Sequence, residues 1–260
     1  MSQLEHLSYS SIRQYMDCGL QYKFRKIDKL DPEHTSEALV FGSAIHKVLN
    51  KFNQCRINNK KVTASELAEW FEEYWNQSAQ QNDNILYANG NDFKTCLDKG
   101  KDLMQTFYVN YPQNEYTVLE VEKEFQLELQ ELNCPIMGYI DLIEQDEHEN
   151  IIITEYKTAN KTYSTQQIDA NDQLTLYNLD IQRLMPESSI MCKIDCLIKT
   201  KQSKFEQYYT TRTQEDFNRI IKVANQVAKG IQNEVFIPNT NSWKCGYCEY
   251  QTACKDYLNS

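Results

Sequence analysis

The chain has 260 residues, of which 41% are hydrophobic and 25% charged, a composition that excludes a disordered chain and is typical of a globular protein. This length can bury one sizeable core, so we expect a single domain with elaborations rather than two independent domains. The net charge of −10 argues against a nucleic-acid partner, but residues 114–150 alone hold eleven acids and one base. The rest of the chain is balanced, and the overall charge therefore decides nothing about the partner.

Two runs of basic residues could still form local patches for nucleic acid: Lys23, Arg25, Lys26 and Lys29 in the first, and Lys193, Lys199, Lys201 and Lys204 in the second. The start of the chain shows no basic stretch followed by an apolar run. No segment offers about eighteen uncharged apolar residues. We therefore expect a cytoplasmic protein with no membrane partner. In that compartment clustered cysteines bind metal more often than they form disulfides.

The first part of the chain is predicted to be helical. One or two short helices follow a Ser cap between residues 8 and 27, and apolar spacing predicts a longer helix over 36–55. Thr63 and Glu66 match a capping box that opens a third helix through residue 75. A fourth helix is predicted over about 92–111.

The hydrophobic period changes after residue 112. Apolar and acidic residues alternate from Leu119 to Leu129, which predicts a half-exposed strand with Leu119 on its inner face. Strands over 136–143 and 151–156 form a hairpin across a polar turn. A helix over 165–184, strands over 190–198 and 205–211, and a helix over 214–232 follow, before a cysteine-rich tail.

This order predicts an α/β fold in one domain over residues 1–260. Its parts are a mainly helical part over 1–112 that carries Cys18 and His46, a mixed central sheet over 113–212, and a terminal helix with a cysteine segment over 213–260. No internal repeat or low-complexity linker is present.

The predicted hairpin carries the first candidate site. Asp141 lies in one strand, and Glu155-Tyr156-Lys157 ends the other, where alternation places Glu155 and Lys157 on the same face. Carboxylates bind Mg²⁺ or Mn²⁺, which lower the pKa of a water, and a lysine beside them can orient that water. This pattern suits phosphodiester hydrolysis, although acid-x-Lys also occurs on solvated sheet edges.

Two helical pairs could complete this site. Gly42 lies one turn before His46 on the same helix face, and glycine inside a helix costs about 1 kcal/mol unless a backbone or a substrate must approach closely. His46 could be a metal ligand or a hydrogen-bonded core residue. Gln173 and Tyr177 lie side by side at i, i+4 spacing and could hold a phosphate or orient a lysine, or be ordinary surface residues.

The tail carries three cysteines in a C-x2-C-x5-C pattern, Cys245, Cys248 and Cys254. Thiolates this close together can share one ion or cluster, and Cys18 is the leading candidate for a fourth ligand. Spacing alone does not choose between zinc and an iron–sulfur cluster. The remaining five, Cys55, Cys96, Cys134, Cys192 and Cys196, lie in apolar periodic runs and are expected to be inert thiols.

Six segments in this order resemble the motifs of RecB-like nucleases of the PD-(D/E)xK superfamily: LSYSSIRQYMDCGLQYKF, FGSAIHKVL, GYIDLI, ITEYKT, QLTLY and CGYCEYQTAC. The sequence is most similar to the members with an iron–sulfur cluster, namely the CRISPR-associated RecB-like exonucleases and the AddB nuclease domain. The resemblance spans residues 7–254 and implies a restriction-endonuclease-like core.

Residue by residue, the resemblance implies that His46, Asp141, Glu155 and the Tyr156 carbonyl bind Mg²⁺ or Mn²⁺. Lys157 would activate the attacking water, and Gln173 and Tyr177 would support it and contact DNA. The four cysteines Cys18, Cys245, Cys248 and Cys254 would hold a structural [4Fe-4S] cluster. Two departures stand out, because Glu155 replaces the usual Asp and Gly19 the usual Pro after the first cysteine, but neither removes a ligand.

We therefore expect a divalent-metal-dependent DNA nuclease, an exonuclease that prefers single-stranded ends, in recombination, repair or CRISPR adaptation. A helicase, recombination or CRISPR adaptation protein would be its partner, and the sequence does not indicate an oligomeric state. Two alternatives remain open at this stage. One is a catalytically silent iron–sulfur or zinc subunit that binds DNA in a larger complex, and the other is a zinc-stapled hydrolase with a different substrate.

Overall fold

The computed structural model describes residues 4–88, 90–112 and 115–259. Residues 1–3 lie outside the described residues. They belong to the start of the chain, where the sequence shows no basic stretch followed by an apolar run. The chain divides into two compact units. The sheet unit comprises Ser36–Phe125 and Tyr139–Thr213, and the terminal unit comprises Met1–Thr35, Gln126–Gly138 and Gln214–Ser260. Whether both act as one nuclease domain stays a prediction.

Three helices form a bundle in the sheet unit: α3 (Glu37–Ile57), α4 (Ala64–Gln81) and α5 (Phe93–Asn110). Their starts follow from local capping, since Thr63 and Glu66 form the expected capping box and the Asp92 side chain accepts from the Thr95 amide. Aromatic side chains fill the space between the helices, with Phe71 and Trp75 fully buried. The helices that the sequence predicted over this part are therefore confirmed.

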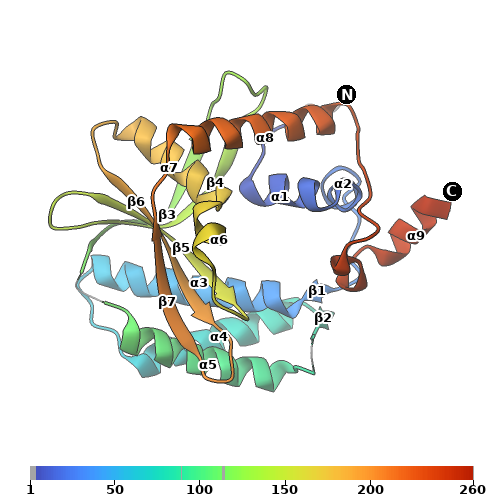
Figure 1. Ribbon diagram of the computed structural model, residues 1–260. Helices are drawn as coiled ribbons and strands as arrows, with labels where there is room; N and C mark the ends of the chain where they lie inside the picture. The colour runs from blue at the N-terminus through green and yellow to red at the C-terminus, as the bar shows by residue number, and fades with distance from the viewer. Residues whose placement is uncertain (1–3, 89, 113–114, 260) are drawn as a thin grey trace. The chain divides into compact units, whose positions relative to one another are not determined.

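The central sheet has five strands in the order β3-β4-β5-β6-β7 (Figure 1). Their bounds are β3 Thr117–Leu127, β4 Ile136–Gln145, β5 Ile151–Ala159, β6 Ile190–Ile198 and β7 Lys204–Thr210. The β4–β5 and β6–β7 pairs are antiparallel and the β5–β6 pair is parallel, so the sheet is mixed, as predicted. Leu142, Tyr156 and Leu197 belong to the core of the helical bundle, which therefore covers one face of the sheet.

The helical crossover between β5 and β6 is divided where one helix was predicted. It consists of α6 (Thr165–Asp169) and α7 (Asp172–Leu184). The first helix ends at its C-cap, Ala170, and the next residue, Asn171, caps the second, because its side chain accepts from the Leu174 amide. Two further elements that the pattern did not predict are the short strands β1 (Thr35–Ser36) and β2 (Ile85–Leu86).

The terminal unit contains the first and last helices of the chain. They are α1 (Tyr9–Asp17), α2 (Gly19–Tyr22), the π-helical turn Lys23–Ile27, α8 (Gln214–Gln232), the 3-10 turn Trp243–Tyr247 and α9 (Gln251–Asn259). Leu20, Phe24 and Tyr250 form a small core beside the cysteines. Of the helices that the structure describes, none is both long and apolar enough to cross a membrane.

Two expectations about single residues are wrong. Leu119 is 38% exposed rather than on the inner face of β3, where Glu122 adopts a positive φ of 51° and interrupts the extended backbone. Lys193 belongs to no surface patch, because its side chain is completely buried. The Glu144 and Asp195 carboxylates lie 3.3 and 3.5 Å from its ammonium and compensate the buried charge.

Candidate functional site

The candidate site lies where strands β4 and β5 stop pairing. Their ladder runs from Gln145 and Ile151 to Leu142 and Thr154. Two residues further along β5, the Tyr156 amide donates instead to the Asp141 side chain, with an N–Oδ2 distance of 2.8 Å. A side chain thus replaces the strand partner, which holds the Asp141 carboxylate against the end of β5.

Three potential metal ligands meet at this point. His46 on α3, Asp141 on β4 and Glu155 on β5 each offer a ligand atom, and these atoms lie within 4.8 Å of one another. His46 Nδ1 is 3.2 Å from Asp141 Oδ1. The Glu155 side chain is 3% exposed and the Asp141 side chain 13%, while the His46 side chain is 30% exposed. The group is therefore nearly buried, with its opening on the histidine side.

The electrostatics of this group favour a cation. Burial and then the charge of Asp141 raise the pKa of Glu155 to about 7. Burial would also raise the pKa of Asp141, but hydrogen bonds from His46 and Tyr156 lower it overall. Burial would lower the pKa of His46, but the hydrogen bond to Asp141 raises it. Two carboxylates packed beside an imidazole suit a hard divalent ion such as Mg²⁺ or Mn²⁺.

Four side chains close a hydrogen-bonded ring next to these ligands. Lys157 Nζ donates to Glu155 Oε1 at 2.6 Å and to Gln173 Oε1 at 2.7 Å. Gln173 Nε2 donates to the Tyr177 hydroxyl at 2.7 Å, and this hydroxyl donates to Glu155 Oε2 at 3.1 Å. Both oxygens of Glu155 are thus oriented, and Lys157 is held beside the acidic group.

The structure therefore brings together the side chains of six predicted site residues: His46, Asp141, Glu155, Lys157, Gln173 and Tyr177. Tyr156 lies at the same place through its backbone, and the role of its carbonyl as a ligand stays a prediction. A Cβ added to Gly42 would lie 3.8 Å from Thr158 Oγ1, an ordinary contact. Among the described residues, no backbone atom approaches this position closely, and the approach of a substrate stays a prediction.

The four predicted cluster ligands line one cavity of the terminal unit. Cys18, Cys245, Cys248 and Cys254 surround a space of about 230 Å³, together with apolar side chains such as Leu20 and Phe24. Burial, and then the charges of neighbours that include Cys18 and Cys254, raise the pKa of Cys248 to about 11. Thiols that raise one another's pKa become stable thiolates when they bind metal.

Gly19 is required by the backbone next to this cavity. A Cβ at this position would lie 2.8 Å from the Ile237 nitrogen and 3.1 Å from the Phe236 Cα, so any side chain would force the backbone to move. The same segment continues to Asn239, whose amide donates to Cys18 Sγ at 3.4 Å. Gly19, which departs from the resembled motif, thus allows its own segment and the Phe236–Asn239 segment to approach closely.

Of the other five cysteines, Cys55 is half-buried and the rest are buried.

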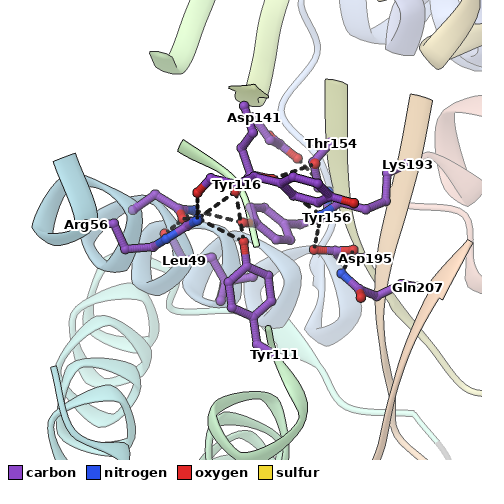
Figure 2. Close-up of polar contacts among 12 residues, drawn as sticks. Leu49, Arg56, Tyr111, Tyr116, Asp141, Thr154, Tyr156, Lys193, Asp195 and Gln207 are labelled. Atoms are coloured by element: carbon purple, nitrogen blue, oxygen red, sulfur yellow. Dashed lines mark hydrogen bonds and ion pairs between the residues drawn. The ribbon is translucent and has the colours of Figure 1, made fainter. Parts of the chain in front are cut away.

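A buried polar layer on the bundle side of the sheet was not predicted from the sequence (Figure 2). Arg56 Nη1 donates to Glu144 Oε1 at 2.7 Å, and Lys193 Nζ donates to Glu144 Oε2 at 3.3 Å. Asn53 Nδ2 donates to the Tyr156 hydroxyl at 2.8 Å. One signal could have found this layer, because Lys193-x-Asp195 interrupts an apolar strand in the same way as Glu155-x-Lys157.

The sequence matches the PD-(D/E)XK nuclease superfamily over residues 6–255, so the chain belongs to this superfamily. A crystal structure of a "putative exonuclease" from Eubacterium rectale has a similar fold, with a TM-score of 0.59 at 11% identity over 94% of this chain and 88% of that chain. The crystal structure of SSO0001 gives a TM-score of 0.47 at 12% identity, over 98% and 88% of the two chains. A comparison with curated proteins gave no match.

Proposed function

We propose that this chain is a divalent-metal-dependent DNA exonuclease that prefers single-stranded ends. The observation that carries the proposal is the meeting of His46, Asp141 and Glu155 within 4.8 Å, beside a lysine that bonds to one of the two carboxylates. Membership of a nuclease superfamily supports nucleic acid as the substrate. The preference for DNA ends rests on the resemblance to RecB-like exonucleases.

The residues of the site suit hydrolysis of a phosphodiester by water. A divalent ion held by His46, Asp141 and Glu155 would polarise the phosphoryl oxygens and lower the pKa of a bound water. Lys157 would donate a hydrogen bond to that water or to the scissile phosphate. Gln173 and Tyr177 would hold the lysine ammonium and the Glu155 carboxylate in a fixed orientation during the reaction. The Tyr156 carbonyl would be a further ligand to the ion.

We further propose that Cys18, Cys245, Cys248 and Cys254 hold a structural [4Fe-4S] cluster, which places the chain among the iron–sulfur members of the RecB-like nucleases. The shared cavity supports one metal group held by all four thiols, and the resemblance to the iron–sulfur members supports a cluster over a zinc ion. The cluster would tie the first helices to the last, because Cys18 precedes α2 and Cys254 lies in α9. Recombination, repair or CRISPR adaptation would be the process, with a partner protein from one of these systems.

A nuclease assay tests the proposed activity. Wild type and Lys157→Ala are compared on end-labelled single-stranded and double-stranded DNA with Mn²⁺ and with a chelator. We expect degradation of linear single strands by the wild type only, with a rate at least about 100-fold above the variant. Circular single strands and strands with either end blocked then separate exonuclease from endonuclease activity and give the polarity.

Two outcomes of this assay would decide against the proposal. Equal rates for the wild type and Lys157→Ala would favour the catalytically silent DNA-binding subunit. Cleavage of RNA but not of DNA would show that RNA is the substrate.

Iron, sulfide and zinc analysis of anaerobically purified protein tests the cluster separately, with Cys248→Ser as the site variant and Cys55→Ser as the control. Stoichiometric zinc without iron would favour the zinc-stapled alternative.

A further inference from the structure

Helix α3 contacts the β4–β5 hairpin through two side chains on one face. His46 Nδ1 lies 3.2 Å from Asp141 Oδ1, and Asn53 Nδ2 donates to the Tyr156 hydroxyl at 2.8 Å. These two helix residues are seven positions apart, which is about two turns and returns to the same face. The helix that supplies the histidine is therefore fixed to the strand that supplies Glu155.

Tyr156 joins the two contacts into a closed frame. Its amide donates to Asp141 Oδ2 at 2.8 Å, and its completely buried ring lies edge-on to the His46 ring, with the ring centres 6.3 Å apart. Tyr156 also stands between Glu155 and Lys157 along β5, where alternation sends its side chain to the opposite face. A shift of the Tyr156 ring would therefore move the backbone that carries both neighbours.

Every polar atom of the Asn53 side chain has a partner, and this side chain is completely buried. Its nitrogen donates to the Leu49 carbonyl at 2.9 Å as well as to Tyr156, and its oxygen accepts from Arg56 Nη1 at 2.9 Å. The three bonds fix which way the amide points. The Nδ2 donor is thus held toward the phenol before any substrate or ion binds.

The polar layer behind Asn53 reaches the sheet at further points. Arg56 also donates to Glu144 at 2.7 Å and to the Tyr111 hydroxyl at 2.9 Å. In Figure 2 the Tyr156 ring lies between Arg56 on one side and Lys193 on the other. The layer is balanced in charge, with two cations facing Glu144 and Asp195, so it can stay dry and rigid beneath the acidic group.

We propose that Asn53 is a positioning residue for the acidic group and acts through the Tyr156 phenol. The three candidate ligands come from a helix and two strands, and metal affinity depends on holding them at fixed separations. Groups that orient metal ligands from behind typically change metal affinity about 10- to 100-fold when they are removed. This inference rests on the proposed function, since it assigns a role at the same metal site.

Two matched substitutions test the proposal. Tyr156→Phe and Tyr111→Phe each remove one buried hydroxyl from the same polar layer and keep the ring. Only the first breaks the contact between α3 and the strand of Glu155. We expect Tyr156→Phe to raise the Mn²⁺ dissociation constant, measured by calorimetry, by about 10-fold, and Tyr111→Phe to leave it within about twofold. Thermal unfolding of both variants records how much stability each loses.

A double-mutant cycle tests whether Asn53 acts through the phenol. Asn53→Leu keeps the approximate shape of the side chain and removes its donor. If the two residues act as one unit, Asn53→Leu with Tyr156→Phe should bind Mn²⁺ no more weakly than the weaker single variant. Additive losses would overturn the coupling. If Asn53→Leu does not fold, the comparison of the two Tyr→Phe variants still decides the positioning role.

The binding measurement separates this proposal from the proposed function. If the wild type binds Mn²⁺ but cleaves no DNA, and Tyr156→Phe binds Mn²⁺ more weakly as expected, the proposed nuclease function is overturned and the positioning role of Asn53 is supported. If the wild type cleaves DNA, and Tyr156→Phe and Tyr111→Phe bind Mn²⁺ equally well, the positioning role is overturned and the proposed function is supported. A wild type that binds no Mn²⁺ would overturn both.

Discussion

The Tyr177 hydroxyl donates to Glu155 Oε2 at 3.1 Å, while Lys157 donates to the other oxygen of the same carboxylate at 2.6 Å. The phenol and the ammonium therefore fix the plane of the Glu155 carboxylate from two sides. Because Gln173 hydrogen-bonds to both the phenol and the ammonium, a substitution at one member of this ring should alter the orientation of the other side chains.

Substitution of Tyr177 by Phe should lower nuclease activity without unfolding the protein. The ring would keep its edge-on contact with Phe125, with centres 5.6 Å apart, but Glu155 would lose a donor and Gln173 an acceptor. We expect a rate loss of about 10-fold and a higher Mn²⁺ requirement, measured as initial rates over an Mn²⁺ titration. The control is Tyr139→Phe, because Tyr139 is 57% exposed and lies outside the ring. Equal rates for both variants would contradict the orienting role.

Local patterns predicted most of the elements, for physical reasons that particular residues make plain. Thr63 and Glu66 predict the start of α4 because they match a capping box. Helix α8 has the predicted bounds because its apolar period runs without interruption from Gln214 to Gln232. The division between α6 and α7 escaped prediction. The apolar period continues through Asn171, and only the bond from the Leu174 amide to its side chain reveals a cap.

The candidate site divides in the same way between what the sequence could and could not predict. The residues of the acidic group and its ring lie in short motifs that occur in a recognisable order. The pattern Lys193-x-Asp195 marks two charged residues in an apolar strand, but it could not show that they are buried, since a charged residue in a strand is buried only when distant segments supply partners. Here Glu144 of β4 and Gln207 of β7 do so, the latter donating to Asp195 at 2.9 Å. No local pattern contains that pairing.

Asp195 should make stability depend on pH in an identifiable window. Burial raises its pKa from 3.8 to about 6, so between these values the folded form keeps a proton that the unfolded form has lost. Its contribution to stability is therefore complete below about pH 4 and is lost as the pH rises to about 6.

The variant Asp195→Asn removes this titration. The free energy of unfolding of the variant minus that of the wild type should increase between about pH 4 and 6 by roughly 1–3 kcal/mol, and then level off. Urea denaturation at several pH values measures the difference, and the exposed Glu147→Gln serves as the control. A difference that does not change across this window would show that Asp195 has an ordinary pKa in the folded protein.

A side chain at Gly19 should disturb the cysteine cavity. The added Cβ of Gly19→Ala would lie 2.8 Å from the Ile237 nitrogen, and the backbone that moves away continues to Asn239, which contacts Cys18. We expect a loss of at least half of the bound iron per chain and a lower unfolding temperature of the anaerobically purified protein. Gly246→Ala is the matched control within the same unit, because a Cβ there meets no atom within 4 Å. Full iron content in Gly19→Ala would show that the backbone shift leaves the cavity intact.

Arg212 should be a stabilising residue for the helix that carries Gln173 and Tyr177. Its guanidinium donates to the Ile168 and Asn171 carbonyls, both at 3.1 Å, and to Thr175 Oγ1 at 2.9 Å, which ties the α6–α7 junction together. Lysine cannot reproduce this fork of donors, so Arg212→Lys should cost roughly 1–3 kcal/mol of unfolding free energy. It should also speed amide hydrogen exchange over residues 165–177.

The exchange measurement distinguishes a local effect from a general loss of stability. Arg219→Lys changes an exposed ion pair with Asp216 and should leave both the unfolding free energy and the exchange rates near those of the wild type. In Arg212→Lys the faster exchange should be concentrated at the junction and in the first turns of α7, because its lost bonds end there. Faster exchange spread evenly over the sheet unit would instead mean that Arg212 contributes to global stability and does not specifically hold α7.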